Sequence, residues 1–185
     1  MRRRMFAAVA LAWLVSACGG IKVTTDFDAS TDFTRYRTFG WMEGSGAGND
    51  PRVSNDLMDQ RFRRAIESEL VSRGLQKVTS GEPDVFVGYQ VALDDQIDYQ
   101  TINTYWGRGW GYRGVYRGGM VSSQTVVARE YTVGTLIIDV FDAARRELIW
   151  RGAGEGRVDF ARNPQERQER INEAVYLIME DFPIG

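Results

Sequence analysis

The chain has 185 residues but no histidine, a single cysteine and only two lysines, Lys22 and Lys77. Without histidine it cannot build a Ser-His-Asp triad, a Cys-His pair or the most common kind of metal site. A lone cysteine cannot form a disulfide within the chain. The sequence also contains no phosphate-binding loop and no EF-hand spacing. We therefore expect no catalytic residue, no cofactor and no bound metal.

Carboxylates are the groups left for catalysis, so the alternative is an envelope hydrolase that acts on glycan or peptide. A glycosidase needs two carboxyl groups about 5 to 9 Å apart, one of them with a raised pKa. The candidates are Asp84, Asp94, Asp95, Asp139 and Asp142. Asp139 lies in an otherwise apolar stretch, which would raise the pKa of its carboxyl. We favour a structural role for Asp139, either at the end of a ladder or in an ion pair with Arg151.

The N-terminus is typical of a secretory signal. Arg2, Arg3 and Arg4 precede an apolar run over residues 5–15, and small residues follow before Cys18. The run is shorter than the about 20 residues that a transmembrane helix needs. Residues 15–18, Val-Ser-Ala-Cys, are similar to a bacterial lipobox, which implies removal of residues 1–17 and lipidation of Cys18. A lipid anchor would also account for the lone cysteine.

The residue after Cys18 bears on where such a lipoprotein resides. This residue is Gly19. In enterobacterial sorting an aspartate at this position favours retention at the inner membrane, so its absence favours the outer membrane. We expect a protein anchored by lipid in the outer membrane and facing the periplasm. Removing the three arginines of the signal lowers the formal net charge from −2 to about −5. Because nucleic-acid binders are usually basic, we expect no nucleic-acid partner.

Two amphipathic helices are predicted. In the first, apolar side chains recur at helical spacing from Met58 to Leu70, with Ser54 as the expected N-cap and Gly74 as the terminating residue. In the second, Asn163 is the expected cap and Pro164 the first helical residue. Its apolar stripe consists of Ile171, Ala174, Val175, Ile178 and Phe182, which we interpret as core packing.

Strands are expected over residues 21–26, 35–41, 75–78, 84–92, 130–142 and 147–152, with residues 155–159 extending the last one past a glycine-rich kink. Together with the two helices, they predict one domain over residues 18–185. We expect an α+β fold in which a mostly antiparallel, mixed sheet carries both helices on one face, as a two-layer sandwich.

The ordered set of these motifs resembles the uncharacterised bacterial lipoprotein family known as domain of unknown function 4136. The resemblance rests on residues 23–28, Phe33, Tyr36, Thr38, Phe39, Trp41, Ile66, Leu70, Gly74, residues 83–89, Tyr131, residues 134–139 and 148–152, and Phe182 with Pro183. It covers nearly the whole chain after the signal. It implies an envelope lipoprotein of α+β type, and it implies no known activity.

A loop rich in glycine, aromatic residues and arginine is expected at about residues 95–125. Residues 99–129 contain four arginines and no carboxylate, whereas Asp94, Asp95 and Asp98 lie just before them. The candidate binding residues are Trp106, Arg108, Trp110, Tyr112, Arg113, Tyr116 and Arg117. The alternative is a long hairpin with strands over residues 100–105 and 121–129, in which the aromatic side chains pack across the strands.

Several contacts would suit this loop. Aromatic faces stack on sugar rings and arginine binds carboxylates, and peptidoglycan offers both. Trp, Tyr and Arg also suit a membrane headgroup region or a protein interface. We predict a lipid-anchored envelope protein with a non-catalytic binding or structural role. Its expected partners are the membrane, through the lipid, and peptidoglycan or an envelope protein.

Overall fold

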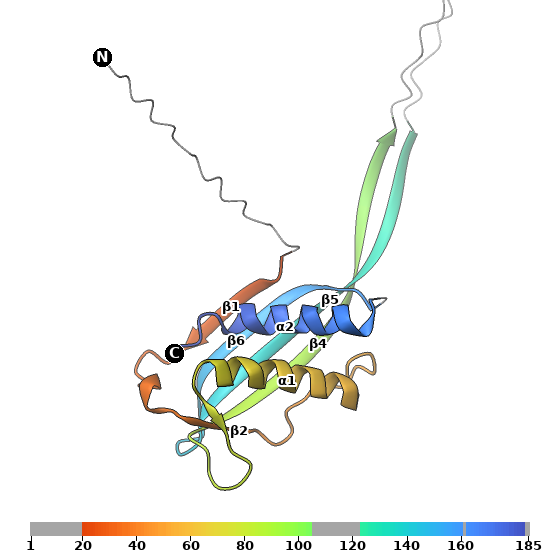
Figure 1. The fold of residues 1–185 in the computed structure, drawn as a ribbon. Helices are drawn as coiled ribbons and strands as arrows, with labels where there is room; N and C mark the ends of the chain where they lie inside the picture. Colours follow the sequence, from red (N-terminus) through yellow and green to blue (C-terminus); the bar gives the residue numbers. More distant parts are fainter. Residues whose placement is uncertain (1–19, 105–122, 161, 184–185) are drawn as a thin grey trace, which may run out of the picture.

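The computed structural model describes residues 20–104, 123–160 and 162–183, which fold as a six-stranded sheet with two helices on one face (Figure 1). The sheet order is β1-β6-β5-β4-β2-β3. The strands are β1 (Lys22–Phe27), β2 (Thr38–Trp41), β3 (Gln76–Lys77), β4 (Val85–Thr104), β5 (Ser123–Asp142) and β6 (Glu147–Val158). The first four in this order pair antiparallel, and β4, β2 and β3 pair parallel. The predicted α+β class is confirmed.

Both helices begin at asparagine caps. Helix α1 (Asp56–Ser72) starts after Asn55, whose side chain accepts a 3.1 Å hydrogen bond from the backbone of Met58. The prediction of Ser54 as the cap was therefore wrong by one residue, because Asn55 has the extended backbone that lets its side chain reach this N–H. Helix α2 (Pro164–Met179) follows Asn163 as predicted.

The core lies between the helices and the sheet. Ile171, Val175, Ile178 and Met179 of α2 are buried, as are Phe62, Ile66 and Leu70 of α1. They pack against sheet residues that include Val87, Ile138 and Trp150. All the buried hydrophobic residues of the described chain lie between Phe33 and Phe182, so the chain after residue 19 contains its own core and forms a folding unit.

Strands β4 and β5 are longer than the sequence predicts. The predicted strands over residues 84–92 and 100–105 are parts of one strand, β4, and residues 123–129 are continuous with the strand predicted over 130–142. Residues 95–104 and 123–125 are therefore strand and not loop. The cluster of Asp94, Asp95 and Asp98 interrupts the apolar pattern without breaking the ladder, since Asp95 accepts a 2.7 Å hydrogen bond from Thr132, its partner on β5.

The predicted strand over residues 35–41 is shorter in the structure. Arg35, the first residue of the predicted strand, belongs instead to a single 3-10 turn, η1 (Phe33–Arg35). Only Thr38–Trp41 pairs with neighbouring strands. The side chain of Asp32 caps this turn by accepting a hydrogen bond from the backbone of Thr34. The local Asp-capped turn thus replaces extended backbone at this point.

A two-stranded arm projects from the body. β6 stops pairing with β5 at the pair Thr132–Val158, but β4 and β5 continue together for nine more pairs, from Gln96–Tyr131 to Thr104–Ser123. We call residues 96–104 and 123–131 the arm. At about 3.4 Å per residue, it is about 30 Å long. Figure 1 shows it extending away from the sheet and both helices.

Helix α2 approaches the sheet closely over two glycines of β6. A Cβ atom at Gly152 would lie 2.6 Å from Cγ2 of Ile178 and would also overlap the indole of Trp150. A Cβ atom at Gly154 would lie 2.7 Å from Cδ1 of Ile178. The register of β6 on β5 is regular from Trp150 to Val158. These glycines, which the sequence predicted as a kink, therefore make room for α2 and for the Trp150 ring.

Replacing Gly152 by alanine will destabilise the fold, because a methyl group there has no space between Trp150 and Ile178. We expect the free energy of unfolding to fall by about 1–3 kcal/mol, as is usual for overpacking a core. Urea denaturation monitored by circular dichroism measures this change. Gly156→Ala is the matched control, since its nearest contact, to Ile21, would be 3.3 Å. Equal stability of the two variants would contradict the account of this packing.

Candidate functional site: the arm and a cleft at its base

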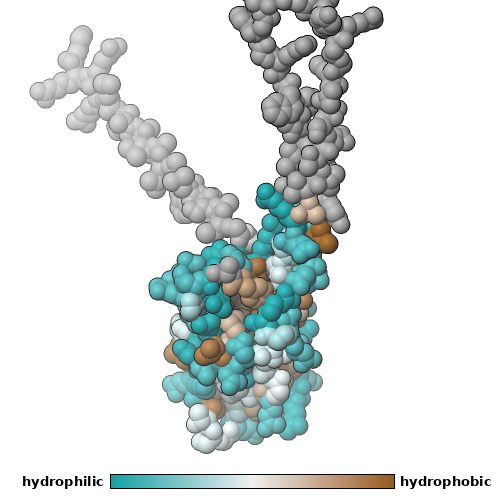
Figure 2. All heavy atoms as spheres, turned by 90° about the vertical axis from the view of Figure 1, so that its right-hand side faces the viewer, coloured by the Kyte–Doolittle hydropathy of each residue, from teal (hydrophilic) through white to brown (hydrophobic). Residues whose placement is uncertain are grey.

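Both helices start at the end of the body from which the arm emerges. β6 ends there at Val158, and the chain turns back into α2 at Pro164. Likewise, Arg52, shortly before α1 begins, forms an ion pair with Asp95 at the base of the arm. In Figure 2 this end of the body faces the viewer, and apolar surface is visible among hydrophilic side chains below the arm.

A cleft of about 960 Å³ lies at this end, between the first turns of the two helices and the sheet. Its volume is within the range of small-molecule sites, which is about 300 to 1,000 Å³. Elements from every layer contribute apolar lining: Ile21, Val53, Met58, Phe62, Val91, Leu93, Leu136, Val158, Phe160, Ile171 and Ala174. Of these, Val91, Leu93 and Phe160 are only partly buried, so the cleft exposes apolar surface.

Arginines surround this apolar interior: Arg52, Arg157, Arg162, Arg167 and Arg170. Three of them have carboxylate partners. Arg52 binds Asp50 at 2.7 Å and Asp95 at 2.9 Å, and these carboxylates raise the pKa of its guanidinium. Arg170 lies 2.6 Å from Glu173, and Arg162 lies 3.8 Å from Asp159.

The other two arginines of the rim differ. The guanidinium of Arg157 stacks on the ring of Tyr131, 4.1 Å from its centroid. The Nε atom of Arg167 is buried and has no hydrogen-bond partner in the part of the chain that the structure describes. Within that part, neither side chain forms an ion pair with a carboxylate.

Sequence reasoning did not find this cleft. Its lining residues come from five separate elements, and each reads in the sequence as an ordinary core or surface position. Arg167 and Arg170 lie on the polar face of a typical amphipathic helix. Only the spacing of the two helices over the sheet reveals that the core is open here.

The carboxylates proposed for catalysis have structural partners instead. Asp139 forms a two-point ion pair with Arg151, at 2.6 and 2.8 Å, as we favoured from the sequence. The carboxylate of Asp84 accepts hydrogen bonds from the backbone of Arg37 and Thr38, which lower its pKa. Asp94 accepts a 3.1 Å hydrogen bond from the side chain of Gln96.

Asp95 and Asp142 also have lowered pKa values. Arg52 and Thr132 donate to Asp95 and lower the pKa of its carboxyl. A glycosidase acid needs the opposite shift, since it must stay protonated near neutral pH. The geometry therefore gives Asp84, Asp95 and Asp142 roles in holding the fold.

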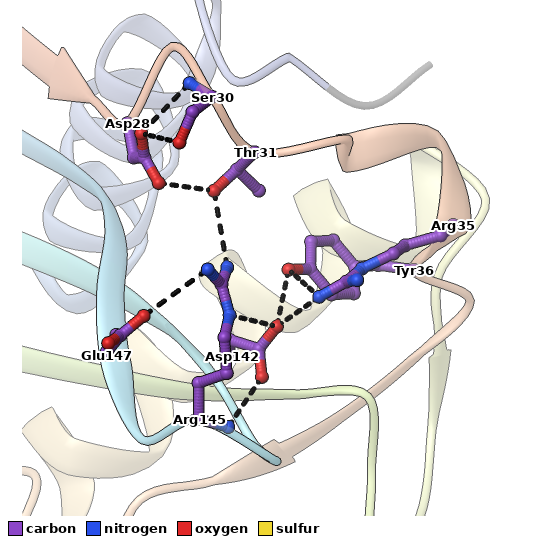
Figure 3. A network of polar contacts seen from close by, with 8 residues as sticks. All are labelled: Asp28, Ser30, Thr31, Arg35, Tyr36, Asp142, Arg145 and Glu147. Carbon is purple, nitrogen blue, oxygen red and sulfur yellow. Dashed lines mark hydrogen bonds and ion pairs between the residues drawn. The ribbon is translucent and has the colours of Figure 1, made fainter.

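Asp142 is the centre of a polar network at the end of the sheet opposite the arm (Figure 3). Its side chain is 2% exposed. It accepts hydrogen bonds from the Tyr36 hydroxyl at 2.8 Å, from the Arg145 backbone at 2.8 Å and from Arg35. Burial raises the pKa of this carboxyl, but the hydrogen bonds outweigh burial and hold the pKa at about 2. The network ties the segment after β1 to the turn between β5 and β6.

The pKa of Asp142 predicts a loss of stability in acid. Since folding lowers this pKa from 3.8 to about 2, the carboxylate stabilises the protein above about pH 4, and this contribution disappears as the pH falls toward 2. The shift corresponds to about 2 kcal/mol. We expect Asp142→Asn to be less stable than the unmodified protein at neutral pH and to approach it near pH 2 in urea titrations. A difference that does not depend on pH would contradict this origin.

The residues predicted for lipidation and binding lie outside the described chain. Cys18 precedes Gly20, and Trp106, Arg108, Trp110, Tyr112, Arg113, Tyr116 and Arg117 fall between Thr104 and Ser123. The structure thus does not show whether these side chains come together. It does show that the chain leading to the latter set is the arm, with which it is continuous at both ends.

Within residues 20–104, 123–160 and 162–183, no helix has both the length and the apolar character needed to cross a membrane. The same residues contain no cluster of three or more metal-binding side chains.

Solved structures with a similar fold come from several bacteria. A PDZ domain protein from Parabacteroides distasonis matches with 14% identity and a TM-score of 0.52 over 87% of this chain. This chain spans only 35% of that protein, and the likeness shows the fold alone. A PelC dodecamer from Paraburkholderia phytofirmans matches with 7% identity and a TM-score of 0.48, over 85% of this chain and 95% of that one.

A DUF4136 family protein from Bacteroides thetaiotaomicron also matches, with 17% identity and a TM-score of 0.49, over 88% of this chain and 96% of that one. No curated protein matches the sequence. The model of the family described as domain of unknown function (DUF4136) matches residues 23–184, which is most of the chain. The resemblance seen in the sequence is therefore confirmed, and the chain belongs to the DUF4136 family.

Proposed function

We propose that this protein is a lipid-anchored protein of the bacterial cell envelope that binds and does not catalyse. In this proposal, Cys18 carries the lipid and the arm contacts the surface of the membrane that holds it. The observation that carries the proposal is the arm, a paired extension of nine residues in each strand that pairs with no third strand among the described residues.

A two-stranded ribbon is at best marginally stable in water, because it buries little apolar surface. An arm of this kind gains stability from a surface against which it can rest. The segment that joins Thr104 to Ser123 is rich in Trp, Tyr and Arg. Trp and Tyr favour the membrane interface, and arginine is attracted to anionic headgroups.

The position of the N-terminus favours the membrane over the cell wall as the partner. β1 begins at the end of the body that carries the arm, and Gly20 borders the cleft there. Only Gly19 stands between Cys18 and Gly20, so the two Cα atoms are at most about 7 Å apart. A lipid on Cys18 would therefore hold the arm end of the body close to the bilayer.

The first test concerns the anchor. We expect Cys18→Ser to move the protein from the membrane fraction to the soluble periplasmic fraction, because the thiol that accepts the lipid is lost. Fractionation of cells followed by immunoblotting measures this. Met5→Ser, within the same leader, is the matched control and should leave the protein with the membrane. Membrane association that persists in Cys18→Ser would contradict a lipid anchor on this residue.

The second test concerns the arm. A soluble chain of residues 19–185 is mixed with liposomes that contain anionic lipid and then sedimented. In a variant without the outer arm, Asn-Gly replaces residues 99–128 and joins Asp98 to Arg129, which face each other in the ladder. We expect the intact arm to raise the bound fraction at least about tenfold, with a strong dependence on salt.

A second variant keeps the arm and changes Trp106, Trp110, Arg113 and Arg117 to alanine, which separates the strands from the segment that joins them. Purified peptidoglycan is sedimented in parallel, since stacking on sugars and pairing with carboxylates favour it as the second candidate. If the arm raises sedimentation with peptidoglycan but not with liposomes, the partner is peptidoglycan and not the membrane. Equal behaviour of all three proteins would contradict a binding role for the arm.

A further inference from the structure

The cleft lies at the base of the arm and shares Tyr131 with it, but the outer arm, residues 99–128, does not line the cleft in the part of the chain that the structure describes. The cleft combines an apolar interior with two cationic side chains that have no carboxylate partner among the described residues. We propose that this cleft binds a long-chain fatty acid, with the hydrocarbon chain inside the cleft and the carboxylate at Arg157 and Arg167.

The interior suits a hydrocarbon chain. Side chains from α1, α2 and three strands form one apolar lining, and Val91, Leu93 and Phe160 leave part of their surface uncovered. An exposed apolar concavity is unfavourable in water, and an alkyl chain that fills it removes apolar surface of both partners from solvent. The volume of about 960 Å³ is at the upper end of the range for small ligands.

The charges of the rim favour an anionic head. Arg52, Arg162 and Arg170 are neutralised by carboxylates of this chain. Arg167 has no ion-pair partner among the described residues, and a carboxylate is the group that a guanidinium binds best, through two hydrogen bonds. Arg157 is held on Tyr131 and keeps its hydrogen-bond donors for a second interaction.

The backbone and the remaining carboxylates agree with this assignment. Glu166 and Arg167 in the first turn of α2 border the cleft, and the partial positive charge of a helix N-terminus favours an anion. Glu166 and Glu169 also lie on the rim, but both are exposed, so water screens their repulsion of a bound carboxylate.

The test is a titration of the soluble chain of residues 19–185 with oleate and, separately, with oleyl alcohol, each below its aggregation concentration. Displacement of a fluorescent apolar probe from the cleft reports binding. We expect saturable binding of one oleate per chain. The double variant Arg157→Gln, Arg167→Gln should weaken oleate binding about tenfold or more and change alcohol binding less than about twofold.

Two further variants separate the site from the stability of the fold. Arg64→Gln, on the exposed side of α1, is the matched control and should bind oleate like the unmodified chain. Ala174→Trp fills the cleft from α2 and should weaken the binding of both ligands at least about tenfold. Circular dichroism and thermal unfolding establish that each variant is folded. The chain without the outer arm should bind oleate unchanged, so this proposal and the arm proposal can fail separately.

The outcomes that overturn the proposal are definite. Binding of neither ligand, binding of many molecules without saturation, or oleate binding that the arginine variant leaves unchanged would each exclude a fatty-acid site here. Equal affinity for oleate and the alcohol would exclude the anionic head, and would point to a plain hydrocarbon occupant such as the acyl chains expected on Cys18.

Discussion

The antiparallel ladder between β4 and β5 is the constraint on which the other parts of the molecule depend. It runs through twenty consecutive residue pairs without an interruption in register. Its inner half lies in the sheet, where β2 and β6 flank it and the helices cover one face. Its outer half has no neighbouring strand within the described chain. The body and the arm are thus two stretches of one pair of strands.

The two ends of the body differ in how they are closed. At the end opposite the arm, the buried Asp142 carboxylate binds Tyr36, Arg35 and the backbone of Arg145, and this network joins the segment after β1 to the turn before β6. At the arm end, the two helices begin over the sheet and leave an apolar cleft between them. Polar contacts close one end, and an apolar cleft opens at the other.

Much of the fold follows from short-range patterns that the sequence displays. The apolar stripe of α2 and its Asn163 cap are local features, and the structure contains both. The Asp139–Arg151 pair was also within reach, because a hairpin turn near residue 144 brings these residues opposite each other. The length of β4 could not be predicted, because the sequence around Asp94, Asp95 and Asp98 indicates a break in the strand unless their partners on β5 are known.

In the candidate site, too, local composition could be recognised from the sequence, whereas features that depend on distant contacts could not. The composition of the segment between β4 and β5 drew attention to it, but only the ladder reveals that a pair of strands extends from the body and leads to it. The cleft could not be predicted, because it depends on the separation of two helices. The room for Trp150 over Gly152 likewise depends on a distance between α2 and β6, for which a glycine in the sequence is only a weak sign.

The arm has a consequence for how this architecture can change over evolution. Residues added in equal number to both strands beyond Gln96 and Tyr131 would extend the ladder without contacting the core. Because side chains alternate between faces with a period of two, insertions of two residues in each strand keep every existing side chain on its own face. The reach of the arm can therefore be lengthened or shortened in steps of about 7 Å, while the core and the cleft remain unaltered.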